Sequence, residues 1–255
     1  EEGPLMNRLE GKVAVVTGAT GGLGAVICEA LARAGASVVA GYNRSSDAAH
    51  ALVADLPATA NGHLAVAAAV TDSAALGRLA RQVQAHYGRC DILVNCAGTT
   101  RFVAHVDLDG LDDALIDSIL ATNVRGPIAC IRALAPLLKA SGDGLVVNIS
   151  SIAARTAMGS NIAYCASKAA VDNLTQSLAR ALAPQVRVVS VAPGLADTEF
   201  VQGLAQDWRD EQAARTPLGR LALPEEVAQA VLALACHLTF TTGAVIPVDG
   251  GRPLS

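Results

Sequence analysis

Short apolar runs alternate with helix-like stretches along almost the whole chain, and no other feature limits the fold as strongly. The runs have the profile of buried parallel strands, and helices fit between them. Parallel neighbours need such crossovers, so we predict an α/β fold: a single-domain, doubly wound (Rossmann-type), seven-stranded parallel sheet with helices on both faces. The predicted strands are residues 13–16, 37–42, 63–68, 92–95, 145–150, 186–191 and 244–248.

The length of 255 residues suits one α/β domain with a large core and is short for two. Hydrophobic residues make up 52% and charged residues 16%, so the chain can bury that core. No repeat, low-complexity linker or break in composition divides the sequence. We therefore expect one domain over residues 6–255, starting at Met6, with residues 1–5 as a cloning remnant or a disordered N-terminus.

Composition argues against several classes of protein. The formal net charge of −4 argues against a basic surface that binds nucleic acid, and the aromatic content of 3% argues against side chains that stack on bases. We see no run of about 18 apolar residues and no signal peptide, which predicts a cytoplasmic protein without a membrane span. The cysteines lack zinc-ligand spacing, so we expect reduced thiols and no metal. They are Cys28, Cys90, Cys96, Cys130, Cys165 and Cys236.

A glycine-rich turn joins the first predicted strand to the first helix. Its sequence is Thr17-Gly18-Ala19-Thr20-Gly21-Gly22-Leu23-Gly24. Glycine permits positive φ and close approach of backbone to a ligand, and the helix N-terminus presents free N–H groups to a pyrophosphate. An ordinary tight turn is the alternative, but the position in the first strand–helix unit favours a dinucleotide site. The spacing fits both T-G-x-x-x-G-x-G and T-G-x-x-G-x-x-G.

A second cluster is suited to acid–base chemistry. Ser151 follows a predicted strand, and Tyr164 and Lys168 lie four residues apart on one face of a predicted helix. A tyrosine hydroxyl is a weak acid, and a nearby ammonium favours the tyrosinate and lowers the pKa. Ser151 can then hold a substrate oxygen while Tyr164 gives or takes the proton. For the Tyr–Lys spacing alone, a partly buried tyrosine and a solvated lysine are the alternative.

Both clusters, with further motifs in order, resemble the short-chain dehydrogenase/reductase family over nearly all of residues 9–251. The further motifs are Asn95-Cys96-Ala97-Gly98, Asn123-Val124-Arg125-Gly126, Pro193-Gly194 with Thr198, Pro224-Glu225-Glu226-Val227-Ala228 and Val248-Asp249-Gly250-Gly251. The resemblance implies an NAD(P)(H)-dependent oxidoreductase that transfers a hydride between the cofactor and a carbonyl or secondary alcohol. The implied catalytic set is Asn123, Ser151, Tyr164 and Lys168.

The resemblance also implies which residues bind the cofactor. They are Gly18, Thr20, Gly22, Leu23, Gly24, Asn43, Arg44, Ser45, Val70, Asn95, Ala97, Gly98, Tyr164, Lys168, Pro193, Gly194 and Thr198. The family often has an aspartate after its third strand, where this chain has Ala69. One adenine contact is therefore missing, and the backbone of Val70 would serve instead.

The end of the second strand predicts the choice of cofactor. A carboxylate there binds the ribose 2′-hydroxyl of NAD, and a cation there accommodates the 2′-phosphate of NADP. The family's acidic position falls on Tyr42, and Arg44 follows, with no acid until Asp47. An arginine can donate two hydrogen bonds to a phosphate at once. We therefore predict a preference for NADP(H), with NAD(H) as the alternative.

Length favours the compact branch of the family, and within it the closest resemblance is to 3-oxoacyl-carrier-protein reductases and related ketoreductases. The extended branch, with epimerases and dehydratases, needs a larger C-terminal region. A non-catalytic nucleotide-binding regulator on the same fold is the other alternative, and the complete catalytic set argues against it. The family also implies a homotetramer, or a homodimer, assembled through the helices after Asp112 and Tyr164. The substrate is not identified beyond a small carbonyl or alcohol.

One prediction about Asn123 follows from helix geometry. The residue four positions later is Pro127, which has no N–H to donate to the Asn123 carbonyl. The helix should therefore be locally bent at this point, and the carbonyl should be free; a kink without catalytic meaning is the alternative. The family resemblance suggests that this carbonyl binds a water linking Lys168 to solvent.

Overall fold

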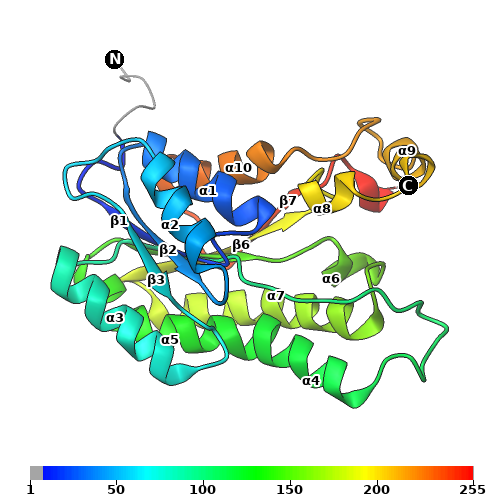
Figure 1. Cartoon of the computed structure of the whole chain (residues 1–255), viewed down its shortest axis with the longest axis horizontal. Helices are drawn as coiled ribbons and strands as arrows, with labels where there is room; N and C mark the ends of the chain where they lie inside the picture. Colours follow the sequence, from blue (N-terminus) through cyan, green and yellow to red (C-terminus); the bar gives the residue numbers. More distant parts are fainter. Residues whose placement is uncertain (1–7, 255) are drawn as a thin grey trace.

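The structure is a computed structural model that describes residues 8–254, so the expected segment 1–5 and the start at Met6 lie outside the described residues. The seven predicted strands form one parallel sheet in the order β3-β2-β1-β4-β5-β6-β7 (Figure 1). The predicted fold class is confirmed, and the strand ends differ from prediction by at most two residues. The strands are β1 Val13–Thr17, β2 Ser37–Tyr42, β3 Leu64–Ala67, β4 Ile92–Asn95, β5 Gly144–Ile149, β6 Val186–Pro193 and β7 Val245–Val248.

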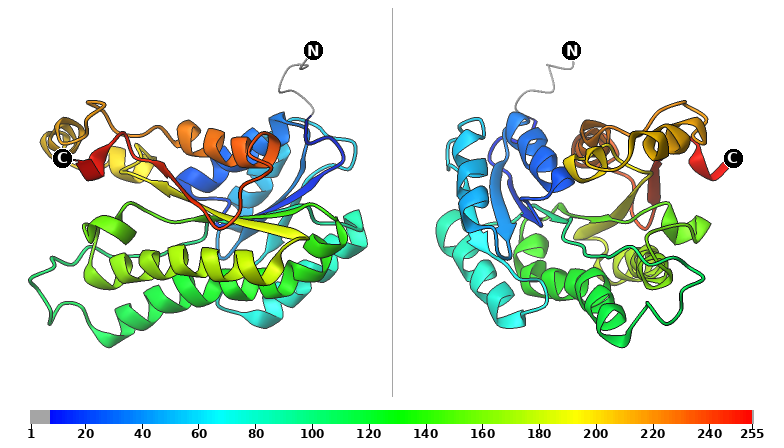
Figure 2. Two further views of the ribbon diagram at one scale, coloured as in Figure 1. Left: turned by 180° about the vertical axis from the view of Figure 1, so that it is seen from behind. Right: turned by 45° about the vertical axis from the view of Figure 1, so that its right-hand side comes forward.

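Helices cover both faces of the sheet. They are α1 Gly22–Arg33, α2 Ser46–Asp55, α3 Ser73–Tyr87, α4 Asp113–Leu120, a π-helical segment Ala121–Arg125, α5 Gly126–Ala140, α6 Ala153–Thr156, α7 Ile162–Leu182, α8 Glu199–Gln202, α9 Gln206–Ala214, α10 Pro224–Cys236 and a 3₁₀ turn Arg252–Leu254. The helices α1, α2 and α10 lie on one face, and α3, α5 and α7 lie on the other (Figures 1 and 2).

Each face of the sheet has its own buried cluster. Within β1, Ala14 and Val16 belong to the cluster under α1 and α10, whereas Val13 and Val15 belong to the cluster over α3 and α5. All four side chains are at most 1% exposed. A strand covered on both faces must be apolar at every position, which explains why the predicted strands appear as continuous apolar runs.

The chain order reverses between β1 and β4, and this reversal locates the site. In the parallel register Thr17 pairs with Asn95, and Asn95 pairs with Asn148 on the next strand. The carboxyl ends of β1, β4 and β5 therefore lie side by side. Ligands of open α/β sheets bind at this point of the topology.

The helical run from Asp113 to Ala140 contains a departure from regular geometry. It is π-helical over Ala121–Arg125, and the N–H of Gly126 donates to the carbonyl of Ala121, five residues earlier. This irregular segment lies just before Pro127, at the place where the sequence analysis expected a bend. Among the described helices this run is long and apolar enough to cross a membrane, by length and composition alone. It packs here on α3 and the sheet, as a core helix of a folded domain does.

Candidate active site

Three glycines of the turn between β1 and α1 lie where a side chain does not fit. A Cβ atom added at Gly18, whose φ is +63°, would lie 2.7 Å from the backbone after β4. One added at Gly24 would overlap the carbonyl oxygen of Gly18, and one at Gly22 would lie 3.0 Å from Cβ of Thr198. A Cβ at Gly21 would meet nothing closer than 3.5 Å. Of the two predicted spacings, the packing therefore favours the one with glycine at 18, 22 and 24, because Gly22 is more tightly enclosed than Gly21.

The same turn leaves the N-terminus of α1 open to a ligand. Its N-cap, Gly21, has no side chain to bond the first-turn N–H groups, so these groups lack partners within the helix. Thr20 and Leu23 are half-buried beside them. Thr198, from the loop after β6, packs against Gly22 on the other side. This backbone cradle fits the pyrophosphate of a dinucleotide, because it offers N–H donors and the positive end of the helix dipole.

Polar side chains at the strand ends join the turn to the rest of the site. Thr17 Oγ1 accepts hydrogen bonds from the N–H groups of Cys96 and Ala97, each over 3.2 Å. Asn95 Nδ2 donates to Asn148 Oδ1 over 2.9 Å, across the paired strands β4 and β5. The Asn95 donor is therefore used inside the sheet, while Ala97 is held against the glycine turn.

Ser151, Tyr164 and Lys168 meet beyond the end of β5. Tyr164 lies in the first turn of α7, and Ser151 lies close enough to its hydroxyl to lower the pKa of the phenol. Lys168 Nζ donates to the carbonyl of Ile149 over 2.9 Å and lies 5.6 Å from the centroid of the Tyr164 ring. A Cβ atom at Gly98 would lie 3.9 Å from this Nζ, so the turn after β4 reaches the same group. Because Lys168 is only 7% exposed, the alternative of a solvated lysine is wrong.

Burial controls the protonation of both groups. Removal from water lowers the pKa of Lys168 to about 8, and Cys96 and Asp172 offset part of that shift. Burial raises the pKa of Tyr164, and the Ser151 side chain offsets only part of the rise. The net shift of the Tyr164 pKa is therefore upward, because desolvation of the phenol is the largest effect, and the lowering predicted for Lys168 stays a prediction. Tyr164 therefore carries its proton at neutral pH.

Asn123 lies in the π-helical segment and is 1% exposed. Its side chain binds the backbone of Thr99 twice: Oδ1 accepts from the N–H over 2.8 Å, and Nδ2 donates to the carbonyl over 3.0 Å. Nδ2 also donates to Ser167 Oγ over 3.1 Å. The Asn123 side chain therefore fixes the segment after β4 against α7.

The turn after β2 presents donors at the position predicted for the cofactor ribose. Asn43, Arg44 and Ser45 are exposed. Among the described residues the Arg44 guanidinium has no hydrogen-bond or ion-pair partner. Ser45 precedes α2 without capping its N–H groups, and the acid in the first turn of that helix is Asp47. Val70, at the same edge of the sheet, is 7% exposed, and its predicted backbone contact with adenine stays a prediction.

The loop after β6 closes the opposite side of the site. The carbonyl of Pro193 accepts from the N–H of Ile152 over 3.0 Å, which ties the end of β6 to the residue after Ser151. The N–H of Gly194 donates to the carbonyl of Val248 over 2.9 Å. The structure thus brings the predicted residues Pro193, Gly194 and Thr198 to the same edge of the sheet as the glycine turn.

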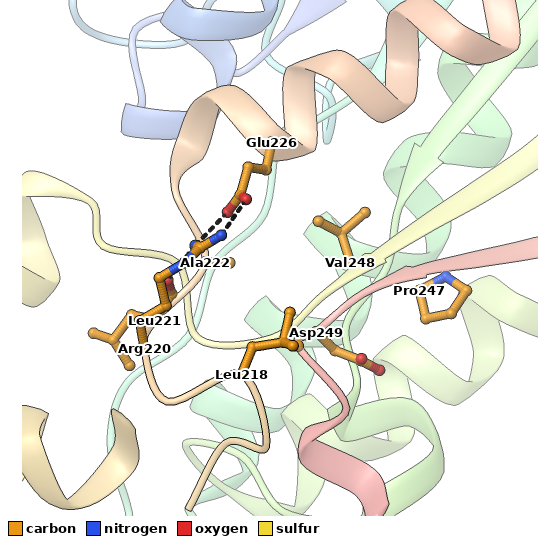
Figure 3. A pocket seen from close by; sticks show the side chains of 9 residues that line it. Leu218, Arg220, Leu221, Ala222, Glu226, Pro247, Val248 and Asp249 are labelled. Carbon is orange, nitrogen blue, oxygen red and sulfur yellow. Dashed lines mark hydrogen bonds and ion pairs between the residues drawn. The ribbon is translucent and has the colours of Figure 1, made fainter. Parts of the chain in front are cut away.

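A pocket of about 230 Å³ lies apart from this cluster, between the start of α10 and the end of β7 (Figure 3). Arg220 donates to Glu226 through both Nη atoms, over 2.8 and 2.6 Å, and Figure 3 shows the two side chains pointing toward each other. Glu226 also accepts from the N–H of Leu223 over 2.8 Å. The Pro-Glu-Glu-Val-Ala motif therefore starts a helix, and its acids take no part in the catalytic cluster.

Two neighbours of the cluster are not predicted by the sequence. Asn161 caps α7, and its Oδ1 accepts from the N–H of Tyr164 over 2.7 Å. An asparagine directly before a helix is an N-cap signal that sequence reasoning could have used. Cys96 acts on the charge of Lys168, and no local pattern signals this, since the strand order brings the two together. Within residues 8–254 no three His, Cys, Asp or Glu side chains gather as a metal site would.

Comparison with known proteins agrees with this geometry. Residues 18–252 match a family model described as enoyl-(acyl carrier protein) reductase. A solved structure of a putative short-chain dehydrogenase/reductase from Burkholderia xenovorans superimposes with a TM-score of 0.89 and 37% identity, covering 96% of this chain and 98% of that one. The chain belongs to the short-chain dehydrogenase/reductase family.

Two relatives of this short-chain dehydrogenase/reductase are named ketoreductases. A putative ketoacyl reductase 2 of the granaticin polyketide synthase from Streptomyces violaceoruber is 40% identical over 251 residues, covering 96% of this chain and 97% of the relative. The 3-oxoacyl-[acyl-carrier-protein] reductase FabG from Thermotoga maritima is 35% identical over 249 residues, covering 96% and 98%. The chain is therefore an oxidoreductase of a family that uses NAD(P)(H), and the full-length match agrees with the compact branch.

Proposed function

We propose that this chain transfers a hydride between NADP(H) and a carbonyl or secondary alcohol in the cytoplasm, with Tyr164 as the acid–base group. The observation that supports this most is that buried Lys168 and the half-buried Tyr164 and Ser151 meet beside a glycine cradle shaped for a dinucleotide. The test is loss of NADPH absorbance with a panel of ketones and 3-oxoacyl thioesters. Turnover of at least one compound is expected, and no turnover across the panel with either cofactor would contradict the proposal.

The chemistry divides among the four residues. The nicotinamide supplies the hydride in reduction and accepts it in oxidation. Ser151 holds the substrate oxygen by a hydrogen bond, and Tyr164 gives that oxygen its proton. Lys168 holds the cofactor ribose, and its ammonium stabilises the tyrosinate left behind. Because burial keeps the pKa of Tyr164 high, the residue holds its proton at neutral pH and is suited to reduction.

Asn123 completes the proposed proton path through its main-chain carbonyl. Pro127 cannot donate to this carbonyl, and the helix is π-helical around it. A water bound there would connect Lys168 with solvent. A proton could then pass from solvent along this path and replace the one that Tyr164 gives to the substrate. A high-resolution crystal structure in which a chain N–H bonds this carbonyl, with no water on it, would exclude the role.

Arg44 carries the proposed preference for NADP(H). Its guanidinium is exposed and has no partner among the described residues, and hydrogen bonds to charged groups contribute about 1.5–3 kcal/mol. Arg44→Ala should therefore weaken NADPH binding roughly 10- to 100-fold, with little change for NADH, which lacks the phosphate. Cofactor fluorescence titration measures both constants. Arg81→Ala, an exposed arginine on α3, is the control for net charge. Equal losses for the two cofactors, or a native preference for NADH, would overturn this assignment.

Assembly into a homotetramer, or a homodimer, is the expected state in solution. The long central helices leave large apolar side chains uncovered: Leu120 is 40% exposed, Ile128 37% and Ile162 41%. Symmetric pairing of these helices would bury them. Light scattering at micromolar concentration should give a mass of two or four chains, and a monomer would contradict this expectation.

A further inference from the structure

Side chains bond both main-chain polar groups of Tyr164. Its N–H donates to Asn161 Oδ1 over 2.7 Å, and its carbonyl accepts from Ser167 Oγ over 2.7 Å. Ser167 Oγ in turn accepts from Asn123 Nδ2 over 3.1 Å. Two buried asparagines, Asn161 and Asn123, are therefore connected to the two ends of the same residue.

The two asparagines also bind one tripeptide, residues 99–101, which follows the turn after β4. The Asn123 side chain forms hydrogen bonds with both the N–H and the carbonyl of Thr99. Asn161 Nδ2 donates to Thr100 Oγ1 over 3.1 Å and to the carbonyl of Arg101 over 2.7 Å. These hydrogen bonds thus form a closed network. It runs through Tyr164, Asn161, residues 99–101, Asn123 and Ser167.

We propose that Asn161 is a positioning residue, which couples the place of Tyr164 to the segment that follows the cofactor turn. This inference rests on the proposed acid–base role of Tyr164. Asn161 touches neither the Tyr164 hydroxyl nor Lys168 in any described contact, so its effect passes through the backbone of α7. Small displacements of a reacting group have large consequences, since about 1 Å can cost 10²-fold in rate.

A helix cap alone would not need an asparagine at this position. Serine and aspartate accept the same N–H bond at an N-cap, but neither offers the amide donors that reach Thr100 and Arg101. Asn161 is 0% exposed and uses its Oδ1 and Nδ2 atoms in these three bonds. Capping of α7 therefore does not account for the Nδ2 amide group, which bonds Thr100 and Arg101.

Two substitutions from opposite sides test the coupling. Asn161→Ser keeps a cap acceptor and replaces the two amide N–H donors by one hydroxyl on a shorter side chain. Thr100→Val removes one acceptor at an exposed position where folding is little at risk. We expect Asn161→Ser to lower kcat by roughly 10- to 100-fold, with the NADPH Kd unchanged. Thr100→Val should lower kcat less, Thr100→Ser should restore it, and the double variant should be no worse than Asn161→Ser alone.

The control for a purely structural effect is the N-cap of α3. Asp72 accepts from Ala74 N–H over 2.8 Å, on a helix that carries none of the four proposed catalytic residues. Asp72→Ser should lower the melting temperature as Asn161→Ser does and leave kcat unchanged. In the pH profile of alcohol oxidation, the apparent pKa of Tyr164 should move upward in Asn161→Ser. The reason is that the phenol of Tyr164 shifts away from the Lys168 ammonium.

The outcomes separate this inference from the proposed function. Native kcat and an unchanged pH profile in both Asn161→Ser and Thr100→Val would overturn the positioning role and leave the role of Tyr164 standing. Native kcat in Tyr164→Phe would overturn the proposed function itself. If Asn161→Ser does not fold, Thr100→Val decides: full activity refutes the coupling, and a loss that Thr100→Ser restores supports it.

Discussion

Tyr164→Phe is expected to lower kcat by about 10²–10⁴-fold, the range attributed to general acid–base catalysis, while NADPH still binds. The substitution keeps the aromatic ring and removes only the hydroxyl that lies beside Ser151. Lys168 retains its bond to the Ile149 carbonyl and its site beside the ring, so the cofactor contacts should survive. Stopped-flow turnover and fluorescence titration measure the two effects separately.

Tyr87→Phe is the matched control for this experiment. Tyr87 ends α3, is half-buried, and donates its hydroxyl to the carbonyl of Gly62 over 3.2 Å. Its loss should reduce stability slightly and leave kcat unchanged. Near-normal turnover in Tyr164→Phe would remove Tyr164 from the chemistry, whereas loss of NADPH binding along with turnover would assign it a binding role instead.

Gly24→Ala is expected to abolish cofactor binding or folding, whereas Gly21→Ala is expected to be tolerated. At Gly24 the new Cβ would overlap the carbonyl of Gly18 and lie 2.9 Å from Cα of Ala19, so the first turn of α1 must move. At Gly21, with φ −78°, the nearest atom is 3.5 Å away. Both variants make the same chemical change three residues apart, so the contrast isolates the close backbone packing.

Thermal melting and NADPH titration of the two variants check this prediction. A Gly24→Ala protein that folds should melt at a lower temperature and show no saturable NADPH binding. Tight NADPH binding in that variant, or equal damage from Gly21→Ala, would mean that the backbone approach seen at this turn is not what forms the dinucleotide site.

The fold could be predicted because its signals are local. A strand buried on both faces, such as β1, must be apolar throughout, and helices must join parallel neighbours. The break before Pro127 was equally predictable, since a missing N–H is a property of one residue. The choice between the two glycine spacings was not, because it depends on what faces Gly21 and Gly22 from elsewhere in the chain.

The parts of the site that escaped prediction depend on contacts across the fold. The net rise in the pKa of Tyr164 was not predicted, because it comes mainly from burial of the phenol, and burial is a property of the whole packing. The role of Asn161 depends on a loop some 60 residues earlier, which only the strand order brings beside α7. The catalytic set Asn123, Ser151, Tyr164 and Lys168 remains a prediction of the family resemblance that the geometry supports.

The measurement that tests the central claim most directly is the transfer of deuterium from NADPH. The cofactor carries deuterium in place of both hydrogens on the nicotinamide carbon that gives the hydride. A ketone found active in the substrate panel is reduced with the labelled cofactor, and the alcohol product is analysed by mass spectrometry. The account predicts one deuterium on the carbinol carbon with the native protein and no labelled alcohol with Tyr164→Phe on the same timescale. An unlabelled alcohol from the native protein, or equal labelling by Tyr164→Phe, would contradict it.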